Sequence, residues 1–211
     1  MYAPAIQQPI TFNEFLAWYP ENSESRYELH EGEIVEMPKP IGKHSRIAGF
    51  VAGKLFQELD RLQSVDFIPK ECVIKPSSER AGYQPDVIAL NGATIDDDPR
   101  WEKDSTITKG ESAKLVIEVV STNWEDDYAL KLDDYETLGI PEYWILDYLG
   151  LGGKRFIGSP KQPTLSIYTL VDGVYQGSQF RSGDRIESPT FPELTLTAEQ
   201  VFRAGKYKGV G

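Results

Sequence analysis

Residues 115–121, Leu-Val-Ile-Glu-Val-Val-Ser, constrain the fold more than any other part of this chain. Apolar and mostly β-branched residues occupy both sets of alternate positions, which predicts a strand buried on both faces of a sheet. One carboxylate, Glu118, stands in the middle of this strand. Because an ionised carboxylate is strongly unfavourable in such a place without an opposite charge, we expect Glu118 to have a charged partner.

A lysine in the next predicted helix is a candidate for that partner. Residues 125–138 form an amphipathic pattern, and at 100° per residue Lys131 falls inside the buried stripe that begins at Tyr128. A lysine on that side must bring its ammonium to a charge or to water. Two interpretations stay open: Lys131 pairs with Glu118, or Lys131 reaches solvent and Glu118 pairs structurally with another basic group.

A second carboxylate stands at the mouth of a neighbouring strand. Asp86 follows Pro85 and precedes the apolar run of residues 87–90, which predicts a buried strand. Two carboxylates can hold a divalent cation that polarises a phosphate and lowers the pKa of bound water, while an ammonium stabilises developing charge. Mg²⁺ needs only one or two carboxylates, because waters and substrate oxygens complete its coordination. The set Asp86, Glu118 and Lys131 therefore points to hydrolysis of phosphodiesters.

Composition bounds the class of protein. The 211 residues, 40% of them hydrophobic, suffice for one domain with a sizeable core, and the net charge of −11 argues against a broad basic face for nucleic acid. The single Cys72 excludes an intrachain disulfide and is interpreted as a small core residue. Residues 1–9 lack a secretion signal, and no apolar run approaches the ~18 residues of a membrane span. We therefore expect a cytoplasmic protein that does not enter membranes.

Local patterns predict most of the remaining elements. We expect a capped helix over 11–19, a hairpin over 27–37, a helix over 43–62, one or two strands over 65–75, a strand over 141–147, strands over 164–171 and 174–181, a strand pair near 185–186 and 194–196, and a last helix capped at Thr197. Gly49 and Gly53 are expected to mark close packing of the long helix on the sheet. The acidic run Asp96–Asp98 is interpreted as a solvated loop rather than a metal site.

Together these motifs resemble a known family. The residues that carry the resemblance are Pro85-Asp86, Ile117-Glu118-Val119-Val120-Ser121, Lys131, residues 135–144 (Tyr-Glu-Thr-Leu-Gly-Ile-Pro-Glu-Tyr-Trp), Tyr27-Glu28-Leu29, Gly32-Glu33-Ile34 and Lys43-His44-Ser45. They are similar to the Uma2 family, formerly DUF820, of the PD-(D/E)XK nuclease superfamily. The similarity runs over about residues 12–196 and is most specific over 115–147.

The resemblance implies an α/β fold with a restriction-endonuclease-like core. The core, about residues 12–150, would hold a central mixed β-sheet flanked by helices, and a β-rich C-terminal extension would follow over about 160–211, all in one domain of residues 1–211. The resemblance assigns metal binding, with Mg²⁺ or Mn²⁺, to Asp86 and Glu118. One departure is that Val120 stands where the superfamily has its lysine, and Lys131 is then the lysine recruited from the next helix.

Three further residues are candidates through the same resemblance. Glu28 matches the superfamily's N-terminal acidic position, which often joins the metal site, but it is equally compatible with a carboxylate at a hairpin edge. His44, at the start of the long helix, is interpreted either as a surface or capping residue or as part of the pocket. Gln84 is a candidate to line the pocket, whereas Tyr128 and Tyr135 are interpreted as core aromatics with polar tips.

The expected function is that of a metal-dependent endonuclease that hydrolyses phosphodiester bonds in nucleic acid, in DNA rather than RNA. Asp86, Glu118, Lys131 and Glu28 are the expected catalytic residues, and a homodimer is expected because nucleases that cut both strands commonly pair. Two alternatives stay open. The fold has lost catalysis and binds a protein or a nucleic acid, or the chain is a structural homodimer that pairs through its β-rich C-terminal third.

Overall fold

The computed structural model describes residues 8–20 and 25–206. Residues 1–7 lie outside this description. They make up most of the segment 1–9, for which the sequence predicts no secretion signal. The strands are β1 (Arg26–His30), β2 (Glu33–Met37), β3 (Val73–Ile74), β4 (Val87–Leu90), β5 (Thr106–Ile107), β6 (Ala113–Val119), β7 (Glu142–Asp147), β8 (Thr164–Val171) and β9 (Val174–Phe180). The helices are α1 (Phe12–Trp18), α2 (Gly42–Leu62), η1 (Ile95–Asp97), α3 (Trp101–Asp104), η2 (Gly110–Ser112), η3 (Asp126–Leu130), α4 (Lys131–Leu138), α5 (Lys154–Ile157) and α6 (Ala198–Ala204).

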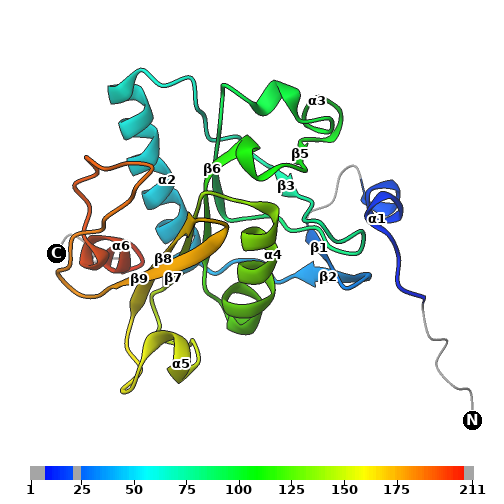
Figure 1. Ribbon diagram of the computed structural model, residues 1–211. Coiled ribbons are helices and arrows are strands. Elements are labelled where there is room, and N and C mark those ends of the chain that lie inside the picture. The colour runs from blue at the N-terminus through cyan, green and yellow to red at the C-terminus, as the bar shows by residue number, and fades with distance from the viewer. Residues whose placement is uncertain (1–7, 21–24, 207–211) are drawn as a thin grey trace, which may run out of the picture.

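A five-stranded mixed sheet in the order β4-β6-β7-β8-β9 forms the centre of the molecule (Figure 1). β6 and β7 are parallel and are joined through η3 and α4, whereas the other neighbouring pairs are antiparallel. The predicted α/β fold with a central mixed sheet flanked by helices is therefore confirmed. The β-rich C-terminal extension continues this sheet, since β8 and β9 are its last two strands.

Alternation along β6 divides its side chains between two cores. Leu115, Ile117 and Val119 lie in the core that α2 and α6 cover. Val116 and Val120 lie in the opposite core, together with aromatic side chains of η3 and α4. Because Glu118 shares the alternation of 116 and 120, its side chain points to the α4 side, and only 3% of the residue is exposed. The prediction of a strand buried on both faces is confirmed.

The hairpin β1–β2 and helix α1 form a smaller unit beside the sheet. Phe12, Phe15 and Leu29 pack in its core, and Leu29 forms a backbone bridge with Gly82, just before β4. The predicted capping box is present, with Thr11 and Glu14 bonded to each other's backbone. This attachment brings β1 to the entrance of β4.

Four local predictions differ from the structure. The one or two strands expected over 65–75 are reduced to the short strand β3 and an isolated bridge at Phe67. The pair expected near 185 and 195 is likewise reduced to a single bridge. Gly49 and Gly53 face open space rather than the sheet. Asp98 is buried, not solvated, because Thr108, Lys109 and Ser112 donate hydrogen bonds to its carboxylate.

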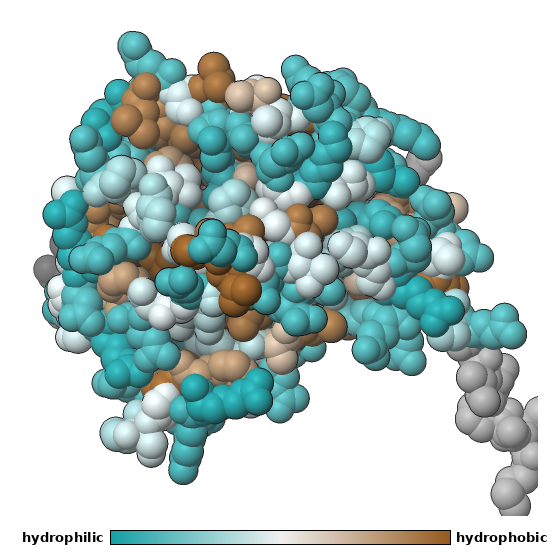
Figure 2. Space-filling view, in the orientation of Figure 1, coloured by the Kyte–Doolittle hydropathy of each residue, from teal (hydrophilic) through white to brown (hydrophobic). Residues whose placement is uncertain are grey.

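The surface is predominantly polar. Figure 2 shows hydrophilic side chains over most of one face, with apolar side chains in small separate groups. Within the described residues, no helix has the length and apolar character needed to span a membrane.

Candidate active site

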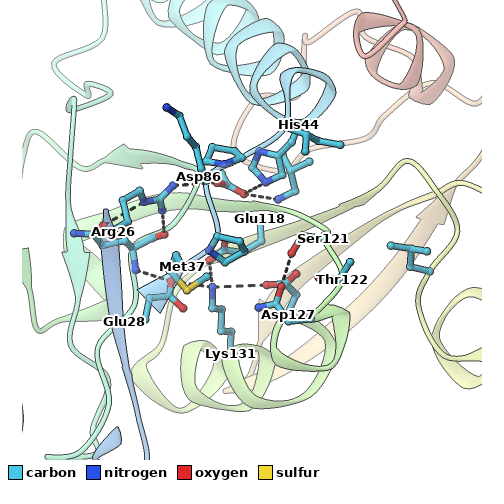
Figure 3. A pocket seen from close by; sticks show the side chains of 18 of the residues that line it. Arg26, Glu28, Met37, His44, Asp86, Glu118, Ser121, Thr122, Asp127 and Lys131 are labelled. Carbon is cyan, nitrogen blue, oxygen red and sulfur yellow. Dashed lines mark hydrogen bonds and ion pairs between the residues drawn. The ribbon is translucent and has the colours of Figure 1, made fainter. Parts of the chain in front are cut away.

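A cavity of about 690 Å³ opens where several parts of the fold meet, among them the segment after β7 with Tyr148 and Leu149. The hairpin β1–β2, the first turn of α2, the segment that enters β4, and the end of β6 with the helix that follows all contribute side chains to it (Figure 3). Its charged lining includes four carboxylates, here called the carboxylate cluster: Glu28, Asp86, Glu118 and Asp127. The connection from β6 to the parallel strand β7 runs through η3 and α4. The end of β6 and this helical segment therefore both line the cavity, with Glu118 on β6 and with Asp127 and Lys131 on the helical segment.

Lys131 and Glu118 form the centre of the site. Lys131 Nζ donates to Glu118 Oε1 over 3.1 Å, and the same oxygen accepts from the Tyr135 hydroxyl over 3.2 Å. Only 2% of the Lys131 side chain is exposed. The open question from the sequence is therefore settled geometrically, since Lys131 reaches Glu118 and not solvent.

Two further carboxylates of the cluster face the same ammonium. Lys131 Nζ lies 3.1 Å from Glu28 Oε1 and 3.7 Å from Asp127 Oδ1. Asp127 precedes Lys131 by four residues, in a stretch where a π-helix, η3, interrupts the α-helical pattern. Such π-turns occur frequently at functional sites. The wider turn still leaves both side chains on the buried side of the helix.

Glu28 ties the hairpin to the cluster. Besides Lys131, its Oε1 accepts from the backbone N–H of Gln84 over 2.9 Å, and its Oε2 lies 2.8 Å from His30 Nε2. Burial raises the pKa of this carboxyl, but the charge of Lys131 and the hydrogen bonds of His30 and Gln84 outweigh it and lower the pKa of Glu28 to about 2. Glu28 is a buried residue of the hairpin strand β1 and also lines the cavity, and its part in a metal site stays a prediction.

Asp86 is held from three sides. Its Oδ2 accepts from the Val119 backbone N–H over 2.9 Å and lies 3.1 Å from His44 Nε2, and its Oδ1 lies 3.5 Å from Arg26 Nη1. Burial opposes ionisation, yet His44, Val119 and Arg26 together lower the pKa of Asp86. In turn, burial opposes the charged imidazole, and the hydrogen bond and charge of Asp86 raise the pKa of His44. The first turn of α2 thus fixes this carboxylate at the end of β6.

The other two carboxyl groups of the cluster, Glu118 and Asp127, are harder to ionise than ordinary carboxyl groups. Burial raises the pKa of Glu118 well above its ordinary value, and although Lys131 opposes this, Asp127, Asp86 and Glu28 reinforce it. Burial likewise raises the pKa of Asp127 to about 7. Conversely, desolvation opposes the charge on Lys131, but its three carboxylate neighbours raise the pKa of its ammonium well above the ordinary value. A cation bound in the cavity would lower the pKa of both groups and so favour their ionised forms.

All six residues predicted from the sequence as site or pocket residues line this one cavity: Glu28, His44, Gln84, Asp86, Glu118 and Lys131. Their roles in catalysis remain predictions. Sequence reasoning missed three neighbours, Asp127, His30 and Arg26, each of which had a detectable signal in its spacing. Asp127 stands four residues before Lys131 on a helix, and His30 stands two residues after Glu28 on a strand, spacings that place side chains on one face. The third, Arg26, lies two residues before Glu28 and donates to the carbonyl of Gln84.

The donor set was tested for its fit to a divalent metal ion. Among the described residues, no group of three or more His, Cys, Asp or Glu side chains is arranged to hold a metal. However, Glu118 Oε2 has no hydrogen-bonding partner in the described part of the chain, and with Asp86 it offers hard oxygen ligands to the cavity. Two carboxylates with waters suit Mg²⁺ or Mn²⁺. The residues present therefore fit such an ion by donor type, with waters completing its coordination.

Comparisons with known proteins agree with the fold. A solved structure titled "Crystal structure of a putative nuclease belonging to DUF820 from Anabaena variabilis ATCC 29413" matches with a TM-score of 0.69 at 21% identity, covering 93% of this chain and 99% of that chain. No curated protein matches the sequence significantly. Residues 12–199 match the model of the Uma2 family, described as "Putative restriction endonuclease". Because this match spans most of the sequence, the chain belongs to the Uma2 family.

Proposed function

We propose that this protein is a metal-dependent endonuclease that hydrolyses phosphodiester bonds in nucleic acid, with DNA as its substrate. The observation that carries the proposal is the convergence of Asp86, Glu118 and Lys131, from three different elements, on one open cavity. A structural ion pair alone would require neither Asp86 nor an unpartnered oxygen on Glu118. The description of the family model as a restriction endonuclease favours DNA over RNA.

Each residue has a role that follows from its contacts. Asp86 and Glu118 would hold Mg²⁺ or Mn²⁺, which when bound polarises the phosphate and lowers the pKa of water. His44 and the Val119 N–H keep Asp86 in place. The Lys131 ammonium, held by Glu28 and Asp127, lies beside Glu118, where it can stabilise negative charge that develops on the phosphate.

The experiment is cleavage of supercoiled plasmid, single-stranded DNA and RNA with Mg²⁺ or Mn²⁺. The test variants are Glu118→Gln and Asp86→Asn. The matched control is Glu142→Gln, because Glu142 is also a buried glutamate, on the neighbouring strand β7, but does not line the cavity. We expect the wild type and the control to nick DNA only when metal is present, and both test variants to lose at least about 10²-fold in rate.

Two results would contradict the proposal. Cleavage that survives in Glu118→Gln would place the chemistry elsewhere or in a contaminant. Absence of cleavage of every substrate by folded wild-type protein would favour the alternative of a nuclease fold that only binds its partner.

A further inference from the structure

A second hollow adjoins the site cavity and has the opposite charge. It has a volume of about 380 Å³ and shares Tyr148 and Leu149 with the cavity, so these two residues form a saddle between them. Its basic side chains are Lys43 on α2 and Arg203 and Lys206 at the end of α6, and together with the hollow they are here called the basic shoulder.

Packing of α6 on α2 builds this arrangement. Figure 1 shows α6 beside α2. A Cβ atom added to Gly205 would lie 3.0 Å from Ile47 Cδ1 and 3.6 Å from the Lys43 carbonyl oxygen, so the end of α6 is seated against the first turns of α2. Consecutive residues of α2 face the two spaces, since Lys43 lines the shoulder and His44 lines the cavity. The shoulder is therefore fixed relative to Asp86, which His44 contacts.

The charges of the shoulder are only partly neutralised. Its one carboxylate, Glu199, pairs with Arg203 over 2.7 Å. Lys43 and Lys206 have no carboxylate within ion-pair distance among the described residues, in a chain whose net charge is −11. Five carboxylates line the site cavity, against only three lysine or arginine side chains (Arg26, Lys39 and Lys131), so its formal charge is unfavourable for a polyanion. A strand entering that cavity needs cationic contacts beside it, and the shoulder supplies them.

The saddle between the two spaces suits a base rather than a phosphate. Leu149 is 50% exposed and Ile41, on the cavity side, is 61% exposed, while Tyr148 is half-buried between them and the core. Unpaired bases bind such surfaces by stacking on aromatic rings and by apolar contact, irrespective of sequence. Paired bases in a duplex do not present their faces in this way.

We propose that the basic shoulder and the Tyr148–Leu149 saddle bind the unpaired strand that flanks the bond to be cut. Phosphates of this flank contact Lys43 and Lys206, and a base lies on the saddle. This inference rests on the proposed nuclease function and adds the substrate class to it: a polynucleotide with a single-stranded segment next to the scissile phosphate.

The test is equilibrium binding of a short fluorescent single strand, measured by anisotropy in EDTA over a series of salt concentrations, with DNA and RNA arms. Lys43→Gln/Lys206→Gln is compared with Lys70→Gln/Lys103→Gln, whose exposed lysines line neither space. Each phosphate contact with a single strand contributes about 0.7 to the slope of log K against log salt. We expect the shoulder variant to bind about tenfold more weakly near physiological salt, with a slope shallower by about 1.4, and the control pair to match wild type.

The outcomes separate this inference from the function on which it rests. Equal affinity and slope in the shoulder variant and the wild type would overturn the inference and leave the nuclease proposal standing. A blunt duplex that binds as tightly as the single strand, and is weakened equally, would overturn the assignment to an unpaired flank. Wild-type protein that binds no polynucleotide, in EDTA and in Mg²⁺ alike, would overturn both.

Discussion

Replacing Lys131 with methionine removes one positive charge from the most buried ionic group of the site. Methionine keeps much of the volume of the lysine stem, so the change tests charge more than packing. The side chains of Glu28, Glu118 and Asp127 are only 0%, 4% and 8% exposed, so water cannot replace the lost ammonium. The fold would then contain three buried carboxylates without their common cation.

The expected loss in the free energy of unfolding is about 3–5 kcal/mol in EDTA, the cost of breaking a buried ion pair by removing one partner. The three contacts share one ammonium, so their contributions do not add. Lys75→Met is the matched control, since Lys75 pairs with Glu79 over 2.9 Å but Glu79 is 66% exposed. An exposed pair of this kind contributes about 0–1 kcal/mol.

The sign of the pH dependence follows from the carboxyl groups. Burial raises the pKa of Glu118, and the charge of Lys131 opposes this rise, so the variant raises it further. A carboxyl with a raised pKa in the folded state stabilises the fold below its unfolded pKa, and that contribution is lost as pH rises through the folded pKa. The deficit of Lys131→Met should therefore be smaller at about pH 5 than at about pH 8.

Urea unfolding in EDTA and in Mg²⁺ measures both effects. If the carboxylates bind the metal, Mg²⁺ at tenfold its Kd adds about 1.4 kcal/mol, and Lys131→Met should gain at least as much as the wild type. If Lys131→Met unfolds in EDTA at the same urea concentration as the wild type, the reasoning is refuted. A deficit that grows as the pH falls would refute it as well.

Three other predictions concern residues outside the site. Gly49→Ala and Gly53→Ala should each stabilise the protein by about 0.5–1 kcal/mol in urea unfolding, because both glycines lie in α2 and face open space; a lower midpoint would contradict this. Burial raises the pKa of the Cys72 thiol to about 12, so iodoacetamide should label it only in denaturant, and rapid labelling of native protein would be the contrary result. Asp98→Ala should lower the free energy of unfolding by about 2–4 kcal/mol, because it leaves the hydrogen-bond donors of residues 108–112 without an acceptor. Calorimetry or urea unfolding measures this, and a change under about 0.5 kcal/mol would disprove that role.

The parts of the fold that the sequence predicts well are those that local chemistry determines. The boundaries of α1 and α6 follow from Thr11 and Thr197, whose capping boxes need only residues three positions apart. The run of apolar residues in β6 itself predicts that the strand is buried on both faces. Lys131 could be named as a candidate partner of Glu118 because a lysine on a buried helix stripe and a glutamate in a buried strand both need an opposite charge.

The features that escaped prediction depend on contacts between distant segments. The π-turn at η3 shifts the helix register by hydrogen bonds that a 100° periodicity does not contain. Asp98 is buried because the 108–112 turn folds over it, and an acidic run by itself only predicts exposure. Segment 65–75 alternates as a strand does, but it forms bridges to other described segments only at Phe67, Val73 and Ile74, and most of it is irregular.

The displaced lysine yields a last prediction. Val120, the position at which the resemblance leads one to expect a lysine, lies two residues beyond Glu118, on the same side of the chain and in the same buried core as Tyr135, whose hydroxyl reaches Glu118. A lysine at position 120 should reach Glu118 only when Lys131 has vacated that space. Val120→Lys alone should therefore be destabilising. The double variant Val120→Lys/Lys131→Met should lose about 0.5–3 kcal/mol less free energy of unfolding than the sum of the losses of the two single variants. A urea double-mutant cycle in EDTA measures this coupling. If the two changes in the free energy of unfolding simply add, a lysine at position 120 does not replace the ammonium of Lys131 beside Glu118.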